Sequence, residues 1–280
     1  ILKAIKNDIV IYSAHTNLDN AQGGVNYKIA EKIGLKDLKV LEPKENSLMK
    51  LVTFVPAAQA DMVRNALFAA GCGNIGNYDS CSYNLEGEGT FRAKEGTHPF
   101  CGTIGELHRE GEVRIETILP VFKKSEVIRT LLSVHPYEEP AFDLYLLQND
   151  WTQAGSGIVG ELEEPETELE FLKRIKKTFE VGCLRHNKLT GREIRKVALC
   201  GGAGAFLLSQ AIRSGADVFI TGEIKYHDYF GHEGDILMAE IGHYESEQYT
   251  KEIFYSIIRD LFPNFALQLS KINTNPIKYL

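Results

Sequence analysis

A histidine and a glutamate, His243 and Glu247, stand four residues apart in the stretch GHYESE (242–247), where the sequence predicts the start of a helix. Side chains at positions i and i+4 of a helix lie on one face. An imidazole and a carboxylate so placed can hold one divalent metal ion or share two. A structural explanation competes, because acidic residues in the first turn stabilise a helix N-terminus. Taken alone, this spacing favours the structural explanation.

A second histidine–carboxylate pair, His15 and Asp19, repeats the spacing near the other end of the chain, after the apolar run 9–12. Metal sites collect ligands from the ends of several elements, so two such pairs favour one metal site assembled by the fold. We predict that Asp19 is a metal ligand and that His15 orients a ligand or faces the substrate. The alternative is a packed histidine followed by a turn.

Two further stretches follow expected strands and could belong to the same site. Residues 201–204 (GGAG) precede a helix, where backbone N–H groups can bind a phosphate. They match neither the dinucleotide nor the P-loop pattern, and a tight turn explains them at least as well. Residues 221–228 contain His227, a candidate acid or base. A solvated helix face explains His227 equally well.

Strands alternate with helices in both terminal parts of the chain, and these elements must position the candidate residues. The apolar patterns predict strands at 8–14, 157–162, 197–200, 218–220 and 236–240. They predict helices at 25–33, 166–179, 205–212 and 243–261. This alternation predicts a largely parallel α/β layer.

The middle of the chain follows a different order, after a polar linker at 42–47. Strands are expected at 51–55, 75–83, from 90, at 113–119 and at 141–147, with helices at 57–70 and 125–133. This order predicts a ferredoxin-like α+β domain. The predicted domains are 1–47 and 149–280, forming two segments of one α/β core, and 48–148, inserted between them. The sequence of the insert shows no ligand cluster of its own, and its conspicuous stretches 87–92 and 135–140 are interpreted as packing or oligomer contacts.

The amino-acid composition favours a globular protein over a nucleic-acid-binding or membrane-spanning one. Hydrophobic residues at 44% and charged residues at 25% are typical of a globular protein, and 280 residues favour two domains. A net charge of −7 without a basic tract makes nucleic-acid binding unlikely. The five cysteines form no C-x-x-C pair, and there is no signal peptide and no apolar run of about 18 residues. We therefore expect a cytoplasmic protein without a membrane span.

Several stretches resemble the GTP cyclohydrolase I type 2 homologues, also called Nif-three-like dinuclear metal proteins. The flanks carry IYSAHTNLD (11–19), VALCGGAGAFL (197–207), GADVFITGEIKYHD (215–228) and IGHYESE (241–247). The centre carries GEGTFR (87–92), GTHPFCGTIGE (96–106) and HPYEEPAFDLYLL (135–147), which are similar to the insert of the longer bacterial members. The resemblance implies a Nif-three-like α/β core with an inserted PII/CutA-like domain.

By this resemblance, Asp19, His243 and Glu247 are ligands of two divalent ions (zinc, iron or manganese), and Glu247 bridges them. The family completes its site with an adjacent His-His pair upstream of IYSAHT, which this sequence lacks. Because the sequence starts at Ile1 without a methionine, we expect that the natural protein continues upstream and that these residues supply part of the ligand shell. The resemblance also implies a toroidal homo-hexamer with the inserts at the openings of the ring.

Two functions follow from these observations. The first is a metal-dependent hydrolase that acts on a nucleotide or similar small molecule, GTP ring opening being the named version, with His227 transferring a proton. The second is a non-enzymatic metal-binding or regulatory hexamer whose insert senses a ligand or gates the ring. The sequence alone does not decide whether the protein is an enzyme. The net charge gives no support to a role in binding DNA.

Overall fold

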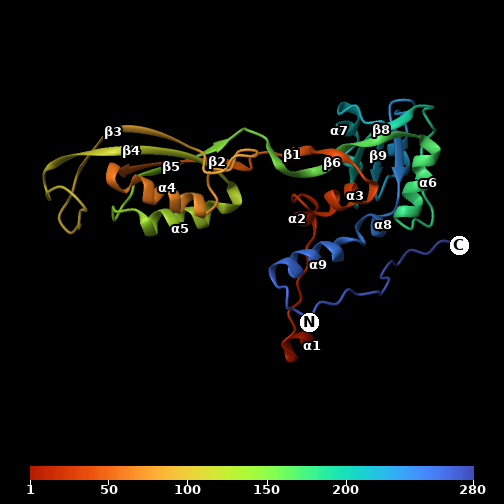
Figure 1. The fold of residues 1–280 in the computed structure, drawn as a ribbon, viewed down its shortest axis with the longest axis horizontal. Helices are drawn as coiled ribbons and strands as arrows, with labels where there is room; N and C mark the ends of the chain where they lie inside the picture. The colour runs from red at the N-terminus through yellow and green to blue at the C-terminus, as the bar shows by residue number, and fades with distance from the viewer. The chain divides into compact units, whose positions relative to one another are not determined.

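The computed structural model describes residues 1–280, and the chain divides into two compact units (Figure 1). One unit combines Ile1–Pro43 with Thr152–Leu280, and the other is Lys44–Trp151. The chain thus leaves the first unit, forms the second, and returns. None of the helices is long and apolar enough to cross a membrane.

The first unit contains a six-stranded sheet with the order β1-β6-β8-β9-β10-β7. Its strands are β1 (Lys36–Lys44), β6 (Trp151–Thr167), β7 (Arg185–His186), β8 (Glu193–Cys200), β9 (Val218–Thr221) and β10 (Leu237–Glu240). β8, β9 and β10 are parallel, whereas β6 pairs antiparallel with β8, and β7 pairs antiparallel with β10. The sheet is therefore mixed, and the prediction of a largely parallel layer holds for its centre.

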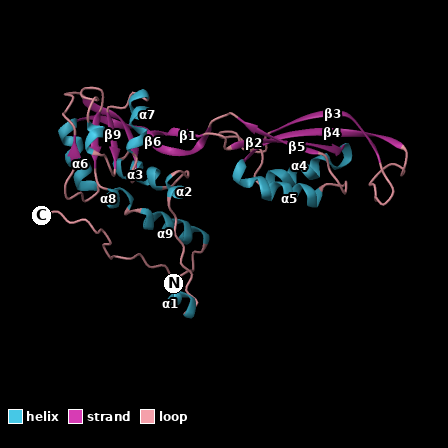
Figure 2. Ribbon diagram, turned by 180° about the vertical axis from the view of Figure 1, so that it is seen from behind, coloured by secondary structure: helices cyan, strands magenta, loops and turns pink.

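Helices cover both faces of this sheet (Figure 2). The helices of the whole unit are α1 (Leu2–Lys6), α2 (Thr16–Asp19), α3 (Val25–Ile33), α6 (Glu168–Thr178), α7 (Leu208–Arg213), α8 (His243–Glu247) and α9 (Thr250–Leu261), with 3-10 turns η3 (Ala205–Leu207) and η4 (Tyr226–Tyr229); α1 buries no residue. On β8, Val197 and Leu199 join the core built with α3, α6 and α9, while Ala198 and Cys200 join the core built with η3 and α7. Successive side chains of a strand point to opposite faces of the sheet, so this alternation shows that β8 is buried on both faces.

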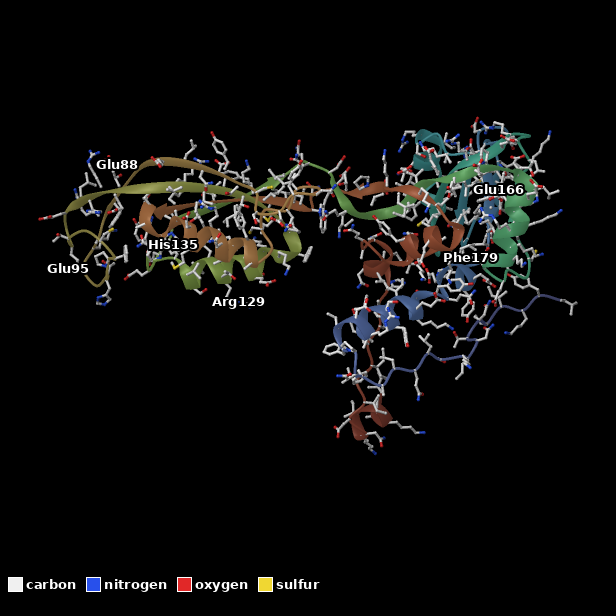
Figure 3. The ribbon with its side chains drawn as sticks, viewed as in Figure 1. Glu88, Glu95, Arg129, His135, Glu166 and Phe179 are labelled. Carbon is white, nitrogen blue, oxygen red and sulfur yellow. The ribbon has the colours of Figure 1, made fainter.

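The local sequence explains where α3 ends and where α6 begins. The helix α3 stops at Gly34, whose φ of 84° lets its N–H bond back to the carbonyl of Ala30. The helix α6 starts after Thr167, whose hydroxyl oxygen accepts from the backbone N–H of Glu170. Phe179, labelled in Figure 3, follows α6. Its ring packs edge-on against that of Tyr249, with the centroids 5.9 Å apart.

Two predictions of local structure in this unit are wrong. Residues 8–14 form no strand, and the apolar side chains at 9–12 are exposed; an apolar run predicts burial but not a pairing partner. The expected helix 243–261 is broken into α8 and α9. On either side of the break, hydroxyl side chains bond backbone carbonyls: Ser246 donates to His243 O and Thr250 donates to Glu247 O. Such bonds compete with the backbone hydrogen bonds of a continuous helix.

The second unit is the inserted domain, and it is ferredoxin-like. Its elements are β2 (Leu48–Pro56), η1 (Ala57–Gln59), α4 (Ala60–Ala69), β3 (Ser82–Arg92), β4 (Leu107–Pro120), η2 (Val121–Lys123), α5 (Lys124–Val134) and β5 (Phe142–Leu147). The antiparallel sheet has the order β3-β4-β2-β5. Side chains of α4 and α5, including Val63, Leu67, Val127 and Leu131, pack on one face of it. The predicted strand–helix–strand–strand–helix–strand order is confirmed.

The second predicted strand of the insert is displaced. Residues 75–83 contain a tight turn in which Ile75 and Tyr78 exchange both backbone hydrogen bonds, and β3 starts only at Ser82. Gly76, with a φ of 57°, lies between them, so glycine at the turn ends the apolar pattern. The polar linker at 42–47 is also shorter than predicted, because β1 extends to Lys44.

Candidate metal centre

The side chains of His243 and Glu247 face each other on one side of α8, with Nε2 of the imidazole 3.4 Å from Oε2 of the carboxylate. On the other side of the ring, Nδ1 lies 2.6 Å from Oε1 of Glu223, which follows β9. A carboxylate at Nδ1 keeps the ring proton on that nitrogen and leaves the lone pair of Nε2 directed at Glu247. This is the arrangement in which histidine ligates metals.

A glycine makes room beside these donor atoms. Gly202 has a φ of 62°, and a Cβ built on it would lie 2.4 Å from Oε1 of Glu247 and 3.3 Å from Nε2 of His243. The backbone of the glycine turn therefore borders the space between the two side chains. Any side chain at position 202 would occupy it. The nitrogen and carboxylate donors and this space fit a divalent ion.

Buried polar contacts join the glycine turn to the elements carrying Asp19 and Glu247. Asn26 on α3 is 1% exposed; its amide donates to the carbonyl of Asp19 at 3.0 Å and accepts from the N–H of Gly201 at 2.8 Å. On the other side, Ser246 of α8 accepts from the N–H of Gly202 at 2.9 Å. The turn is thus bonded to α8 through Ser246 and linked through Asn26 to Asp19 at the end of α2.

The charges of the two sequence pairs act on one another. Burial raises the pKa of Asp19, and electrostatic interaction with His15 and His243 opposes this rise. Burial likewise raises the pKa of Glu247; His243 and His15 lower it, and the negative charge of Asp19 raises it further. Cys200 is buried beside both carboxylates, and burial is the main cause that raises its thiol pKa to about 12. Two carboxylates that repel each other in a half-buried site favour a cation between them.

The two other predicted site histidines are the catalytic candidates, His15 on the substrate side and His227 as acid or base, and the structure places them differently. His15 immediately precedes α2 but makes no side-chain capping bond; its Nδ1 lies 3.1 Å from the hydroxyl of Thr16, and it interacts electrostatically with Asp19 and Glu247. His227 is exposed on η4, where its ring contacts those of Tyr226 and Phe230. No hydrogen bond or ion pair joins His227 to the candidate metal centre, so its catalytic role stays a prediction.

Three of the four backbone amides of the glycine turn 201–204 are bonded within the protein. The N–H groups of Gly201, Gly202 and Gly204 donate to side-chain oxygens of Asn26, Ser246 and Thr221, respectively. Of the two interpretations of this stretch, the structure favours the tight turn over the phosphate cradle.

A cavity of about 610 Å³ opens next to the candidate metal centre. Glu223, His243 and Glu247 line it, together with Lys251 of α9 and residues of the C-terminal stretch 270–277. Its polar lining includes acidic, basic and amide side chains. A small polar molecule placed here would lie against the imidazole of His243 and the two carboxylates that flank it.

The comparisons with known proteins agree with the fold. Residues 1–276 match the family model Duf34/NIF3 (NGG1p interacting factor 3). This chain belongs to the Duf34/NIF3 family. The GTP cyclohydrolase 1 type 2 homolog of Halalkalibacterium halodurans is 43% identical over 285 residues, which cover the whole chain and 77% of that protein. Its namesake in Bacillus subtilis is 37% identical over 288 residues, covering the whole chain and 76% of that protein.

A solved structure gives the same result for the three-dimensional fold. The Bacillus cereus protein related to NIF3 superposes with a TM-score of 0.82 at 38% identity, covering the whole chain and 76% of that structure. The predicted resemblance and fold class are thereby confirmed. Proteins of the Duf34/NIF3 family generally bind metal ions.

Sequence reasoning missed Glu223 as part of this site, although it lies in the stretch 221–228 that drew attention to His227. The signal was available, because Glu223 follows a parallel strand at the edge where α/β sheets place functional side chains. The sequence pointed to His227 as the functional residue of this stretch because imidazoles serve as acids and bases. In the structure, Glu223 and not His227 contacts His243.

Proposed function

We propose that this protein is a divalent-metal-dependent hydrolase acting on a nucleotide or similar small molecule, with Asp19, His243 and Glu247 as metal ligands. The contact between His243 and Glu223 carries the proposal, because it directs Nε2 toward Glu247 beside a cavity. The name shared by the relatives, GTP cyclohydrolase 1 type 2 homolog, supports a nucleotide as substrate. Two ions of zinc, iron or manganese per chain are part of the proposal.

Each side chain of the site has a separate role in the proposed reaction. A bound divalent ion of this kind lowers the pKa of a coordinated water and polarises the substrate oxygen. Glu223 holds the imidazole of His243 in one tautomer and orientation. Lys251, in the cavity wall, supplies positive charge for a phosphate group. His15, whose charge acts on both proposed carboxylate ligands, is better placed than His227 to move a proton.

The test is turnover of a panel of nucleotides by the purified protein with added Mn²⁺, Fe²⁺ or Zn²⁺. The proposal expects metal-dependent product formation that Glu247→Gln abolishes and that Glu233→Gln, on an exposed glutamate elsewhere in the same unit, leaves intact. Product formation that survives Glu247→Gln and metal removal would contradict the proposal.

A second function is favoured by a feature of the insert. A cavity of about 710 Å³ lies in this unit and is lined by Arg114 and Tyr137 among others. A regulatory protein whose insert senses a small ligand would use such a cavity, with metals in the other unit serving structure or storage. A small molecule that shifts the melting temperature of the wild type would favour this function if the shift is lost in Arg114→Gln and unchanged in Glu247→Gln.

The proposed assembly for either function is a homo-hexamer, as the family resemblance implies. Light scattering coupled to size-exclusion chromatography measures the mass of the assembly directly. A monomeric mass would contradict the proposed ring.

A further inference from the structure

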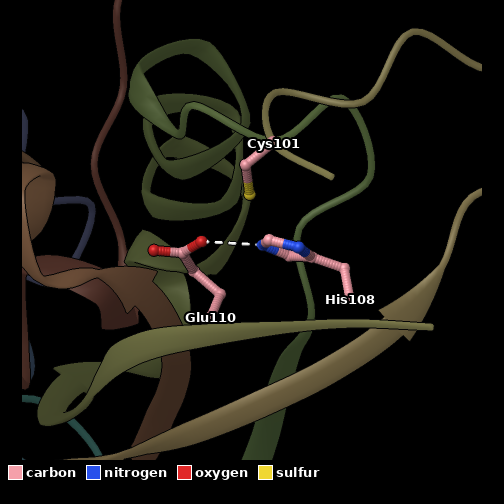
Figure 4. A group of neighbouring side chains, drawn as sticks. All are labelled: Cys101, His108 and Glu110. Carbon is pink, nitrogen blue, oxygen red and sulfur yellow. Dashed lines mark hydrogen bonds and ion pairs between the residues drawn. The ribbon is translucent and has the colours of Figure 1, made fainter. Parts of the chain in front are cut away.

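Three side chains of the insert bring a thiol, an imidazole and a carboxylate together (Figure 4). His108 and Glu110 are two residues apart on β4, so both side chains project from the same face of the sheet. Cys101 comes from the loop between β3 and β4. One ligand atom from each residue lies within 4.8 Å of the other two. Nε2 of His108 is 2.8 Å from Oε2 of Glu110.

The loop is shaped to bring the thiol to this point. Gly102, next to Cys101, has a φ of 82°, and a Cβ built on it would lie 2.8 Å from Cγ of His108. Any other residue at position 102 would push the loop away from the imidazole. Phe91 on β3, paired with His108 across the ladder, stacks at a tilt on the ring with centroids 5.2 Å apart. The ring is therefore held between the neighbouring strand and the loop.

The charges around the cluster also favour a cation. Glu110 and Glu112 both lie on β4, and no lysine or arginine forms an ion pair with either of them. Glu110 has His108 as its ion-pair partner, and Glu112 accepts from the hydroxyl of Tyr137 at 2.7 Å. That hydroxyl lies 4.0 Å from the sulfur of Cys101. Two carboxylates and a thiol thus lie around the imidazole of His108, while His135 contacts Tyr137 and interacts with Glu112.

We propose that Cys101, His108 and Glu110 form a second metal site, in the insert, that binds Zn²⁺ or a divalent ion of similar softness. Thiolate and imidazole ligands select zinc-like ions over Mg²⁺ and Ca²⁺, which take oxygen ligands. Donor atoms around a tetrahedral ion are about 3–4 Å apart, so the three donors need to move by only about 1 Å. An ion here replaces the direct bond between His108 and Glu110 and ties the loop to β4.

Three protein ligands leave the fourth position of a tetrahedral ion for water or another donor. Glu112 and Tyr137, which flank the cluster, also line the cavity of about 710 Å³ in the insert. The site therefore adjoins a space in which a small molecule fits. The sequence showed no ligand cluster in the insert, because Cys101 reaches the other two residues only through the closed loop.

The test is a titration of the whole protein with Co²⁺ as a spectroscopic substitute for Zn²⁺. A thiolate bound to Co²⁺ gives a charge-transfer absorption band in the near ultraviolet, which ions held by nitrogen and oxygen alone do not give. The proposal expects this band in the wild type and its loss in Cys101→Ser. In His108→Gln and Glu110→Gln the band should need at least about tenfold more Co²⁺ to reach half of its maximum.

Two cysteines serve as matched controls. Cys81→Ser changes another half-buried thiol of the insert and should leave the band unchanged. Cys200→Ser changes the thiol beside the candidate metal centre of the first unit. A band that disappears in Cys200→Ser, or survives in Cys101→Ser, would overturn the proposal, as would a wild type without any band.

A second measurement needs no variant and so does not depend on folding of one. The wild-type protein is alkylated with iodoacetamide with and without Zn²⁺, and each modified cysteine is quantified by peptide mass spectrometry. Zn²⁺ should slow alkylation of Cys101 at least about tenfold, while the exposed Cys183 reacts at the same rate in both samples. Equal rates at Cys101 would overturn the proposal.

Discussion

The imidazole Nδ1 of His243 lies 2.6 Å from Oε1 of Glu223, a residue 20 positions earlier in the chain. The contact joins the segment after β9 to the start of α8 and orients the ring that faces Glu247. A histidine held in this way offers one defined nitrogen to a ligand, whereas a free ring would sample several orientations and both tautomers.

Replacing Glu223 by glutamine tests the importance of this contact. The amide retains the shape but removes the negative charge, so it holds the ring proton less firmly. Loss of such a partner typically weakens metal affinity by about 10- to 100-fold. Competition with a chromophoric chelator measures that affinity for Zn²⁺. The exposed Glu233→Gln is the matched control, and equal affinities of the two variants would refute the assigned role.

Gly202→Ala tests whether space beside the donor atoms is required. Position 202 has a φ of 62°, and the added Cβ would meet the carboxylate of Glu247. Backbone strain alone costs about 1–3 kcal/mol of unfolding free energy. Gly215→Ala controls for it, because Gly215 has a φ of 72° and no neighbour within 4 Å of a new Cβ. Both variants should lose stability in urea unfolding, but only Gly202→Ala should also lose metal affinity.

The pairing of His243 with Glu247 was predictable from sequence because it depends on the period of one helix. The ferredoxin-like order of the insert was predictable for a similar reason, since each of its elements carries its own apolar pattern. Both features are local. Their boundaries were less accurate, as the turn at Ile75 and Tyr78 shows.

Contacts made by the fold were not predictable in the same way. Glu223 reaches His243 because two parallel strands end at one edge of the sheet, and nothing in the spacing of the two residues indicates it. Cys101 reaches His108 because a glycine closes a loop. The run 9–12 shows the opposite failure, since its apolar side chains predict a buried strand and yet lie exposed. The apolar pattern of a segment indicates which secondary structure the segment prefers, but contacts with other segments decide whether that structure forms.

His135, at the end of α5 in Figure 3, makes the stability of the insert depend on pH. Its Nε2–H donates to the carbonyl of Phe54, and its Nδ1 accepts from the N–H of Tyr137. A second proton on the ring, at Nδ1, would point at the N–H of Tyr137 and break that hydrogen bond. Burial lowers the pKa of His135 below its ordinary value of 6.5, an effect that the charge of Glu112 and the bond to Phe54 only partly oppose.

The unfolded chain therefore takes up this proton at a higher pH than the folded chain. The contribution of His135 to stability should be complete above about pH 6.5 and should decline as the pH falls below that value. Urea unfolding from pH 8 to pH 5 measures this decline. In His135→Asn it should be smaller than in the wild type, whereas His98→Gln, on an exposed histidine, should reproduce the wild-type curve. An unchanged decline in His135→Asn would contradict the assignment.

Asn26 tests whether the glycine turn and α2 are held as one structure. In Asn26→Ala the buried N–H of Gly201 and the carbonyl of Asp19 each lose a partner. An unsatisfied buried group costs about 1–3 kcal/mol, so urea unfolding should show at least that loss. Asn7→Ala, which removes an exposed bond to Lys3, should change stability by less than about 0.5 kcal/mol. Because Asn26 positions the segment that carries Asp19, metal affinity should fall in Asn26→Ala but not in Asn7→Ala; unchanged affinity would place Asp19 outside the metal centre.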